Sequence, residues 1–244
     1  MKINKAFCFF EQSGTFKAAF RKCGVWAQDY DIQDEFGKTD HQIDLFEQIN
    51  TAYHTTDKTI FDEITPDDLI IAFFPCIYFS QYNQMFFTGT SLYWKNKDQQ
   101  TILRGIIDRA EERQKYYDLL LKLCYIVEMR NLRLIVENPF SVNHYLYNNF
   151  PYKPAIVDVD RTRKGDYFTK PTQYYFINCY PTTLKTVDTR RDAIKIEHLS
   201  GNHGGGICNT ERSLISLEYA ENFINDYILG IRTKKTERTL FDNL

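Results

Sequence analysis

Short apolar runs alternate with segments of helical spacing in the first part of the chain. Residues 6–10 form a continuous apolar and aromatic run, which is typical of a buried strand. After a break at residues 13–15, apolar side chains recur at helical spacing over residues 16–23, and Gly24 ends the pattern. A second strand is predicted over residues 25–32. The order strand, turn, helix, strand predicts the opening of a doubly wound α/β sheet.

The rest of the hydrophobic pattern continues in the same way. Residues 69–74 are apolar throughout, as expected of a central parallel strand with both faces covered. Residues 98–131 carry an apolar stripe between charged positions and predict one long helix. Shorter strands are predicted over residues 133–136, 155–159 and 173–179, and a closing helix over residues 216–228.

We expect a single domain over residues 1–230, since no internal repeat or low-complexity linker interrupts the pattern. Its mostly parallel sheet would lie between helices in a Rossmann-like, three-layer α/β/α arrangement. Residues 77–131, an aromatic loop followed by the long helix, are interpreted as an insertion. Within it, residues 81–98 have no clear period and predict a mobile loop. Residues 231–244 are interpreted as a polar tail.

Composition is that of an ordinary globular protein, with 43% hydrophobic and 25% charged residues. The six cysteines are scattered without a CxxC pair, which argues against a disulfide scaffold and against a zinc site. The apolar run near the N-terminus is too short for a signal peptide or a membrane span. These features predict a cytoplasmic protein with reduced thiols, no metal and no membrane association.

Net charge gives little guidance about nucleic acid as a partner. The chain has 30 basic and 32 acidic residues, for a formal net charge of −2. This balance argues weakly against a large electrostatic footprint on DNA or RNA, but it is compatible with a local basic groove.

Candidate site residues follow the predicted strands one after another. Gly14 follows the first strand, Asp31 ends the second, and Asp44 is expected to end a short third element. Residues 75–76 end the fourth strand and residues 137–139 end the fifth. Each has an ordinary explanation when taken alone: a turn glycine, a solvated or capping acid, or a small buried thiol. Because open α/β sheets bind ligands at the carboxyl ends of their strands, the combination predicts a ligand site.

Several of these segments resemble motifs of the DNA cytosine-C5 methyltransferases, a family of class I S-adenosylmethionine (SAM) enzymes. Residues 72–80, AFFPCIYFS, resemble the family's PC-x-x-FS motif, and residues 136–139, VENP, are similar to its ENV motif. Residues 10–16, FEQSGTF, look like a degenerate F-x-G-x-G-G-F loop for SAM. Residues 211–216, followed by a helix, resemble the final motifs that complete the SAM pocket. The resemblance touches most of the chain and implies the class I methyltransferase fold.

The resemblance also implies a reaction on a cytosine of DNA that is flipped out of a duplex or already single-stranded. The Cys76 thiolate would attack C6, and Glu137 would bind and protonate the N3 edge of the base. The methyl group of SAM would then pass to C5. Arg163 or Arg161 would contact the base or a phosphate. The resemblance places SAM on Phe10, Gly14, Thr15, Asp31, Asp44 and Pro75, and the substrate on Ser80, Asn138 and Arg161.

The sequence departs from the family pattern in three places. Gln12 and Thr15 occupy positions where the family has glycine, which the backbone needs for a close approach to the cofactor. The segment between Cys179 and Glu211 is too short for a normal target-recognition region. The segment between Cys76 and Glu137 is longer than expected, and its aromatic residues could stack on unpaired bases or form a packing flap or partner interface.

Two alternatives to a DNA methyltransferase therefore stay open. A catalytically inactive relative would use the fold to bind DNA, a nucleotide or a protein, which fits the missing glycines and the near-neutral charge. Another enzyme of the same fold would modify a pyrimidine in RNA or in a free nucleotide. The retained Cys76 and Glu137 favour catalysis, because a binding protein has no need of that pair.

Overall fold

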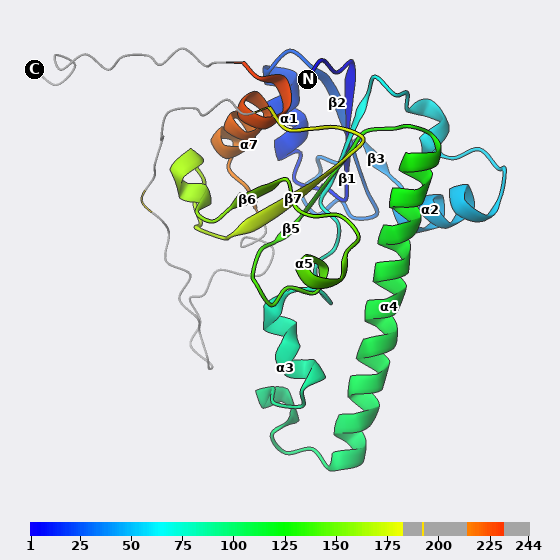
Figure 1. The fold of residues 1–244 in the computed structure, drawn as a ribbon, viewed down its shortest axis with the longest axis vertical. Coiled ribbons are helices and arrows are strands. Elements are labelled where there is room, and N and C mark those ends of the chain that lie inside the picture. The colour runs from blue at the N-terminus through cyan, green and yellow to red at the C-terminus, as the bar shows by residue number, and fades with distance from the viewer. Residues whose placement is uncertain (183–191, 193–213, 232–244) are drawn as a thin grey trace, which may run out of the picture.

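The computed structural model describes residues 1–182, residue 192 and residues 214–231 (Figure 1). The predicted tail from residue 232 onward, and residues 211–213 at the start of the predicted final motifs, lie outside the described residues. Among the described helices, none is long and apolar enough to cross a membrane.

Seven strands form one sheet in the order β3-β2-β1-β4-β5-β7-β6. Neighbouring strands from β3 to β5 are parallel, whereas β7 runs antiparallel to both β5 and β6. The strands are β1 (Lys5–Phe9), β2 (Trp26–Asp31), β3 (His41–Gln42), β4 (Leu69–Ala72), β5 (Leu134–Pro139), β6 (Ile156–Asp158) and β7 (Thr172–Ile177). The predicted α/β class and mostly parallel sheet are confirmed, and the topology is compatible with a Rossmann-like fold.

The helices connect and cover these strands. They are α1 (Thr15–Lys22), α2 (Leu45–His54), α3 (Gln84–Phe87), α4 (Gln99–Met129), α5 (Tyr145–Asn149) and α7 (Leu217–Phe223). Four 3-10 segments are η1 (Ile60–Glu63), η2 (Gln81–Asn83), η3 (Leu92–Trp94) and η4 (Arg161–Lys164). A π-helical segment, η5 (Ile224–Leu229), continues α7.

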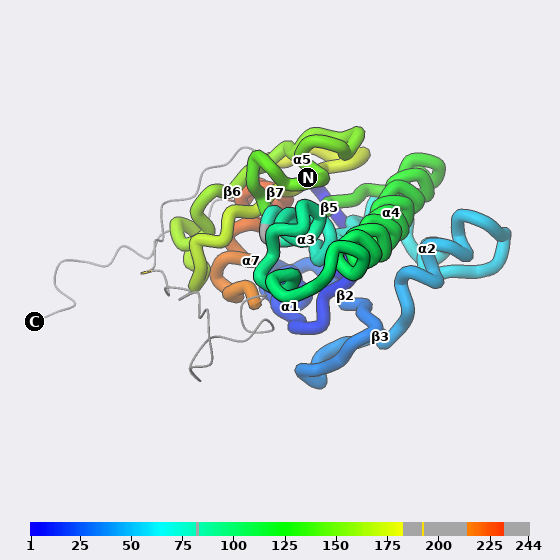
Figure 2. Tube along the Cα trace, turned by 90° about the horizontal axis from the view of Figure 1, so that it is seen from below, coloured from blue at the N-terminus to red at the C-terminus, as the bar shows by residue number. Residues whose placement is uncertain are grey.

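Alternate residues of the central strands face two different apolar cores. Phe7 and Phe9 of β1 pack with buried side chains of α2 and α4. Ala6 and Cys8 of the same strand pack with α1 and α7. Because β1 and β4 are covered on both faces, their sequences are apolar at nearly every position, as the pattern predicted. Figure 2 shows α4 and α7 on opposite sides of the sheet.

The predicted insertion forms an arm that consists of η2, α3, η3 and the first half of α4. It projects from the sheet in Figure 1. Residues 81–98, predicted as a loop without regular structure, instead form three short helical turns. Their rings pack within the arm: Arg109 of α4 lies 4.3 Å from the ring centre of Phe86, and Trp94 is buried. The buried side chains of α4 all lie in its second half, from Leu119 onward, where the helix covers the sheet.

Two further differences bear on the site. The strand predicted over residues 133–136 continues to Pro139, because antiparallel β7 pairs with it and sets Glu137 opposite Tyr174. Helix α2 has no predicted counterpart, and Asp44, expected to end a strand, is its N-cap. The Asp44 carboxylate accepts hydrogen bonds from the backbone N–H groups of Phe46 (2.9 Å) and Glu47 (3.2 Å).

Candidate active site

A cavity of about 630 Å³ lies at the carboxyl ends of β1, β2, β4 and β5. Strand order reverses between β1 and β4, which is where doubly wound sheets bind their ligands. Its volume suits a cofactor or a small substrate. The predicted site residues that line this cavity are Phe10, Asp31, Asp44, Pro75, Cys76 and Glu137. It is also lined by Glu11, Phe36, Tyr116 and Lys170, to which the sequence assigned no role, and by Leu214 and Ile215 of the segment that was expected to complete the SAM pocket.

The loop between β1 and α1 is organised by Glu11. The N-cap of α1 is Gly14, with a φ of 69° and no side chain to cap the helix. The Glu11 carboxylate takes over this role, with Oε1 accepting from the backbone N–H groups of Thr15 (2.6 Å) and Phe16 (3.2 Å). Burial raises the pKa of Glu11, against the effect of these hydrogen bonds. The helix N-terminus, a favoured position for ligand phosphates, is therefore already occupied by a side-chain carboxylate.

Gln12 lines the cavity, and its side chain forms hydrogen bonds with the segment that follows β2. Its Nε2 donates to Gln33 Oε1 (3.2 Å), and its Oε1 accepts from the backbone N–H of Glu35 (3.0 Å). Gly14 and Thr15, in contrast, shape the loop without lining the cavity. They set the course of the backbone beside the cavity, and their contact with a cofactor stays a prediction.

The two acids at the end of β2 have different surroundings. Asp29 is fully buried and forms an ion pair with Lys17 at 2.9 Å, while also accepting from the backbone N–H of Asp40. Asp31 lines the cavity, and its Oδ1 accepts from the backbone N–H of Gln33 at 2.8 Å. Burial raises the pKa of Asp31. Asp31 is therefore the acid of this strand that a ligand can reach, as predicted.

Aromatic rings form an apolar wall beside these acids. The ring centres of Phe10 and Phe74 lie 5.3 Å apart, and those of Phe10 and Phe46 lie 5.6 Å apart. All three residues line the cavity, as does Asp44 at the start of α2. An apolar wall with carboxylates at its edge can hold a flat ring that carries polar groups on its rim.

Cys76, Glu137 and Lys170 line the same cavity from three segments: the turn after β4, strand β5 and the segment before β7. Burial raises the pKa of the Cys76 thiol; the nearby Glu137 raises it further and Lys170 lowers it. Burial also raises the pKa of Glu137, while Lys170 and Arg161 lower it. The Glu137 side chain is 8% exposed, and its carboxyl group makes no hydrogen bond with the described residues. It is thus a buried acid that faces the cavity without a partner in the described chain.

Asn138 acts on the backbone rather than in the cavity. It is fully buried, and its Nδ2 donates to the backbone oxygens of Phe74 (2.9 Å) and Glu137 (2.7 Å). These bonds join the end of β5 to the segment that carries Pro75 and Cys76. Ser80, also predicted to bind substrate, does not line the cavity, and its hydroxyl accepts from Asn83 Nδ2 at 2.9 Å.

The two predicted arginines do not line the cavity. Arg161 and Asp166 are both fully buried and form an ion pair, and Arg161 also lies over the ring of Tyr219 at 4.8 Å. Burial opposes the charge of Arg161, but Asp166 together with Tyr219, Tyr174 and Glu137 outweighs burial, and the pKa of the guanidinium is raised. Arg163 has a side chain that is 59% exposed, and its Nε lies 3.9 Å from Asp160.

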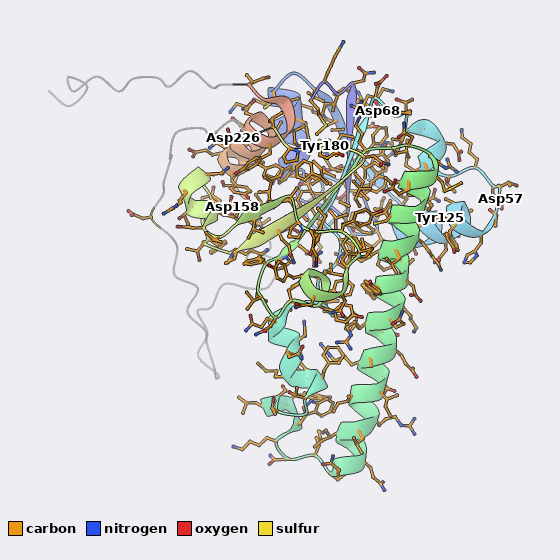
Figure 3. The ribbon with its side chains drawn as sticks, viewed as in Figure 1. Asp57, Asp68, Tyr125, Asp158, Tyr180 and Asp226 are labelled. Carbon is orange, nitrogen blue, oxygen red and sulfur yellow. The ribbon has the colours of Figure 1, made fainter. Side chains whose placement is uncertain are left out.

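The surroundings of Arg161 belong to the interface between the sheet and α7. Tyr219 of α7 donates to Asp158 of β6 at 3.2 Å, and Lys164 donates to Asp226 of η5 at 3.3 Å. Asp158 and Asp226 lie on the α7 side of the molecule, away from the arm (Figure 3). Arg161 therefore lies at the contact between η4 and α7, outside the cavity lining.

Lys170 is the functional candidate that the sequence analysis missed. The available signal was a basic residue followed by proline, directly before the strand that pairs with β5. The motif resemblance had assigned the basic role to Arg161 and Arg163 instead.

Among the described residues, no group of three or more His, Cys, Asp or Glu side chains is placed to hold a metal ion. The described cysteines, including Cys76, are free thiols. In the comparisons with known proteins, no protein-family model matches the chain, and no curated protein matches its sequence at a significant level.

Proposed function

We propose that this protein transfers a methyl group from SAM to C5 of a cytosine in DNA, through a covalent adduct with Cys76. The observation that carries the proposal is the meeting of Cys76 and Glu137 in one cavity with Asp31, Asp44 and the loop after β1. The residues expected to perform chemistry and those expected to hold the cofactor thus line one space.

The charge of the cavity supports SAM over a dinucleotide. SAM carries a positive sulfonium and a positive ammonium group, whereas a dinucleotide brings a negative pyrophosphate. Glu11, Asp31, Asp44 and Glu137 line the cavity, against Lys170 as the one basic residue of the described lining. Glu11 also fills the N-terminus of α1, where a pyrophosphate would otherwise sit. A cationic ligand therefore fits this end of the sheet better than a phosphate.

The fold agrees with this proposal. The sheet resembles that of class I SAM methyltransferases, and apolar cores on both of its faces fit a three-layer α/β/α arrangement. The aromatic wall of Phe10, Phe46 and Phe74 next to Asp44 suits an adenine ring, and Asp31 suits the ribose hydroxyls.

The chain's own residues account for the steps on the base. The Cys76 thiol loses its proton, and the thiolate forms a bond to C6 of cytosine while the electron pair of the C5–C6 double bond moves toward N3. Glu137, whose pKa is raised by burial, donates a proton at N3. SAM, when bound, supplies an electrophilic methyl group for C5. A base, here solvent, then takes the C5 proton, the Cys76–C6 bond breaks to return the thiolate, and N3 gives its proton back to Glu137.

Calorimetric titration tests the ligand class directly. SAM should bind, whereas NAD⁺ and ATP should bind much more weakly or not at all. Asp31→Asn should weaken SAM binding about tenfold or more, the effect expected for one charged hydrogen bond. Glu35→Gln is the matched control on the same segment, because Glu35 is exposed and does not line the cavity. NAD⁺ binding in preference to SAM would contradict the proposal, and binding of neither would favour an inactive relative.

A further inference from the structure

The cavity places the Cys76 thiol together with the Glu137 carboxyl group, and the thiol needs a nearby cation to react. A thiolate forms more readily beside a positive charge. The arginines that were expected to contact the base or a phosphate do not line the cavity: Arg161 is paired with buried Asp166, and Arg163 is exposed beside Asp160.

Lys170 lines the cavity together with Cys76 and Glu137. The backbone around it is fixed on both sides. The Thr172 hydroxyl donates to the Lys170 carbonyl at 2.9 Å, and the N–H of Phe140, just after β5, donates to the Pro171 carbonyl at 2.8 Å. The segment that carries Lys170 is therefore tied to the end of the strand that carries Glu137.

The Lys170 ammonium makes no hydrogen bond or ion pair with the described residues, although its side chain is half-buried. Burial lowers its pKa, while Glu137 and Cys76 raise it. The other titratable groups of the described lining are Glu11, Asp31, Asp44 and Tyr116, none of which supplies a positive charge. Among the described residues that line the cavity, Lys170 is thus the cation that can lie near the Cys76 thiolate, and it has no partner among them.

We propose that Lys170 is a catalytic residue of this site, whose ammonium stabilises the Cys76 thiolate and then the negative charge that moves onto the base. In the first step the thiol proton leaves to solvent and the thiolate stays beside Lys170. In the second, the sulfur–C6 bond forms, N3 takes the proton of Glu137, and the base oxygen faces the ammonium. The role on the base rests on the proposed function. The effect on the thiol does not, because it needs neither SAM nor DNA.

The rate of Cys76 alkylation by iodoacetamide, followed by mass spectrometry of the Cys76 peptide at several pH values, tests this inference. Lys170→Met should shift the rate–pH profile to higher pH and slow alkylation about tenfold at neutral pH, since a neighbouring charge shifts a pKa by about one unit or more. Lys170→Arg should restore most of the rate. Glu137→Gln should shift the profile in the opposite direction, because it removes a negative charge near the thiol.

Lys153→Met is the matched control, because Lys153 is exposed and does not line the cavity. Circular dichroism would verify that each variant is folded. A folded Lys170→Met variant that alkylates at the wild-type rate and pH would overturn the inference. If alkylation depends on Lys170 but the protein transfers no methyl group, the pairing of Lys170 with the Cys76 thiolate stands. Only the proposed reaction is then rejected.

Discussion

Replacing Asp166 by Asn should lower the free energy of unfolding by about 3–5 kcal/mol, because it leaves a buried guanidinium without its counter-charge. Arg161 and Asp166 are both fully buried. Asp166 Oδ1 also accepts from the backbone N–H of Ser216 at 2.9 Å, at the start of α7. The substitution therefore weakens the contact between η4 and α7. Urea unfolding followed by circular dichroism would measure the decrease in the free energy of unfolding.

Two control variants separate the buried charge from other effects of mutation. Arg163→Met should change stability by less than about 0.5 kcal/mol, because the Arg163–Asp160 pair is exposed. The double variant Arg161→Met with Asp166→Leu should recover much of the stability lost in Asp166→Asn, since no unpaired charge remains. If Asp166→Asn unfolds at the wild-type urea concentration, the pair does not hold this interface together.

Glu137→Gln should lower methyl transfer by about 10²–10⁴-fold, the usual contribution of a positioned acid, because an amide cannot donate the proton that N3 requires. The same substitution should stabilise the fold at alkaline pH. Burial makes the ionised Glu137 carboxylate unfavourable in the folded protein, and the neutral amide avoids that cost. Such a gain appears as a higher Tm, at about 2–4 °C for each kcal/mol in a domain of this size.

The sign of the pH dependence follows from the raised pKa of Glu137. Below its ordinary pKa of 4.5 the Glu137 carboxyl group is protonated in both the folded and the unfolded protein. The ionisation of Glu137 then makes no difference between the stability of the wild type and that of Glu137→Gln. As pH rises through the raised folded pKa, the wild type loses stability and the variant does not. Thermal unfolding at several pH values measures the difference. Glu111→Gln, at an exposed position of α4, should show no such trend; a similar trend there would remove Glu137 as its source.

The strand ends were predictable because burial of both faces leaves a clear signal in the sequence. The run over residues 69–74 predicted a central strand, and β4 occupies its first four residues. From there the rule for ligand sites in open sheets led to Asp31, Cys76 and Glu137, all of which line the cavity. The hydrophobic pattern predicts strand ends because the apolar period and the positions of turns are local properties of the chain.

The groups that act through tertiary contacts were not predictable in the same way. Glu11 has no local signature that separates it from other charged residues, and the proline after Lys170 is a weak one, since the positions of both depend on a helix end and on strand pairing. Asn138 and Arg161 were predicted to bind substrate from a motif resemblance, yet the Asn138 amide donates to backbone oxygens and the Arg161 guanidinium pairs with a buried carboxylate. A motif fixes the position of a residue in the chain, whereas the direction of its side chain follows from the packing around it.

Transfer of label from radiolabelled SAM to mixed genomic DNA, measured for the wild type beside Cys76→Ser, tests the central claim most directly. Cys23→Ser is the matched control, because this half-buried thiol does not line the cavity. The account predicts label in DNA with the wild type and with Cys23→Ser, and a loss of at least about 10³-fold with Cys76→Ser, the scale of removing a nucleophile. Labelled DNA that persists in Cys76→Ser, or no label from a wild type that fails to bind SAM, would contradict it.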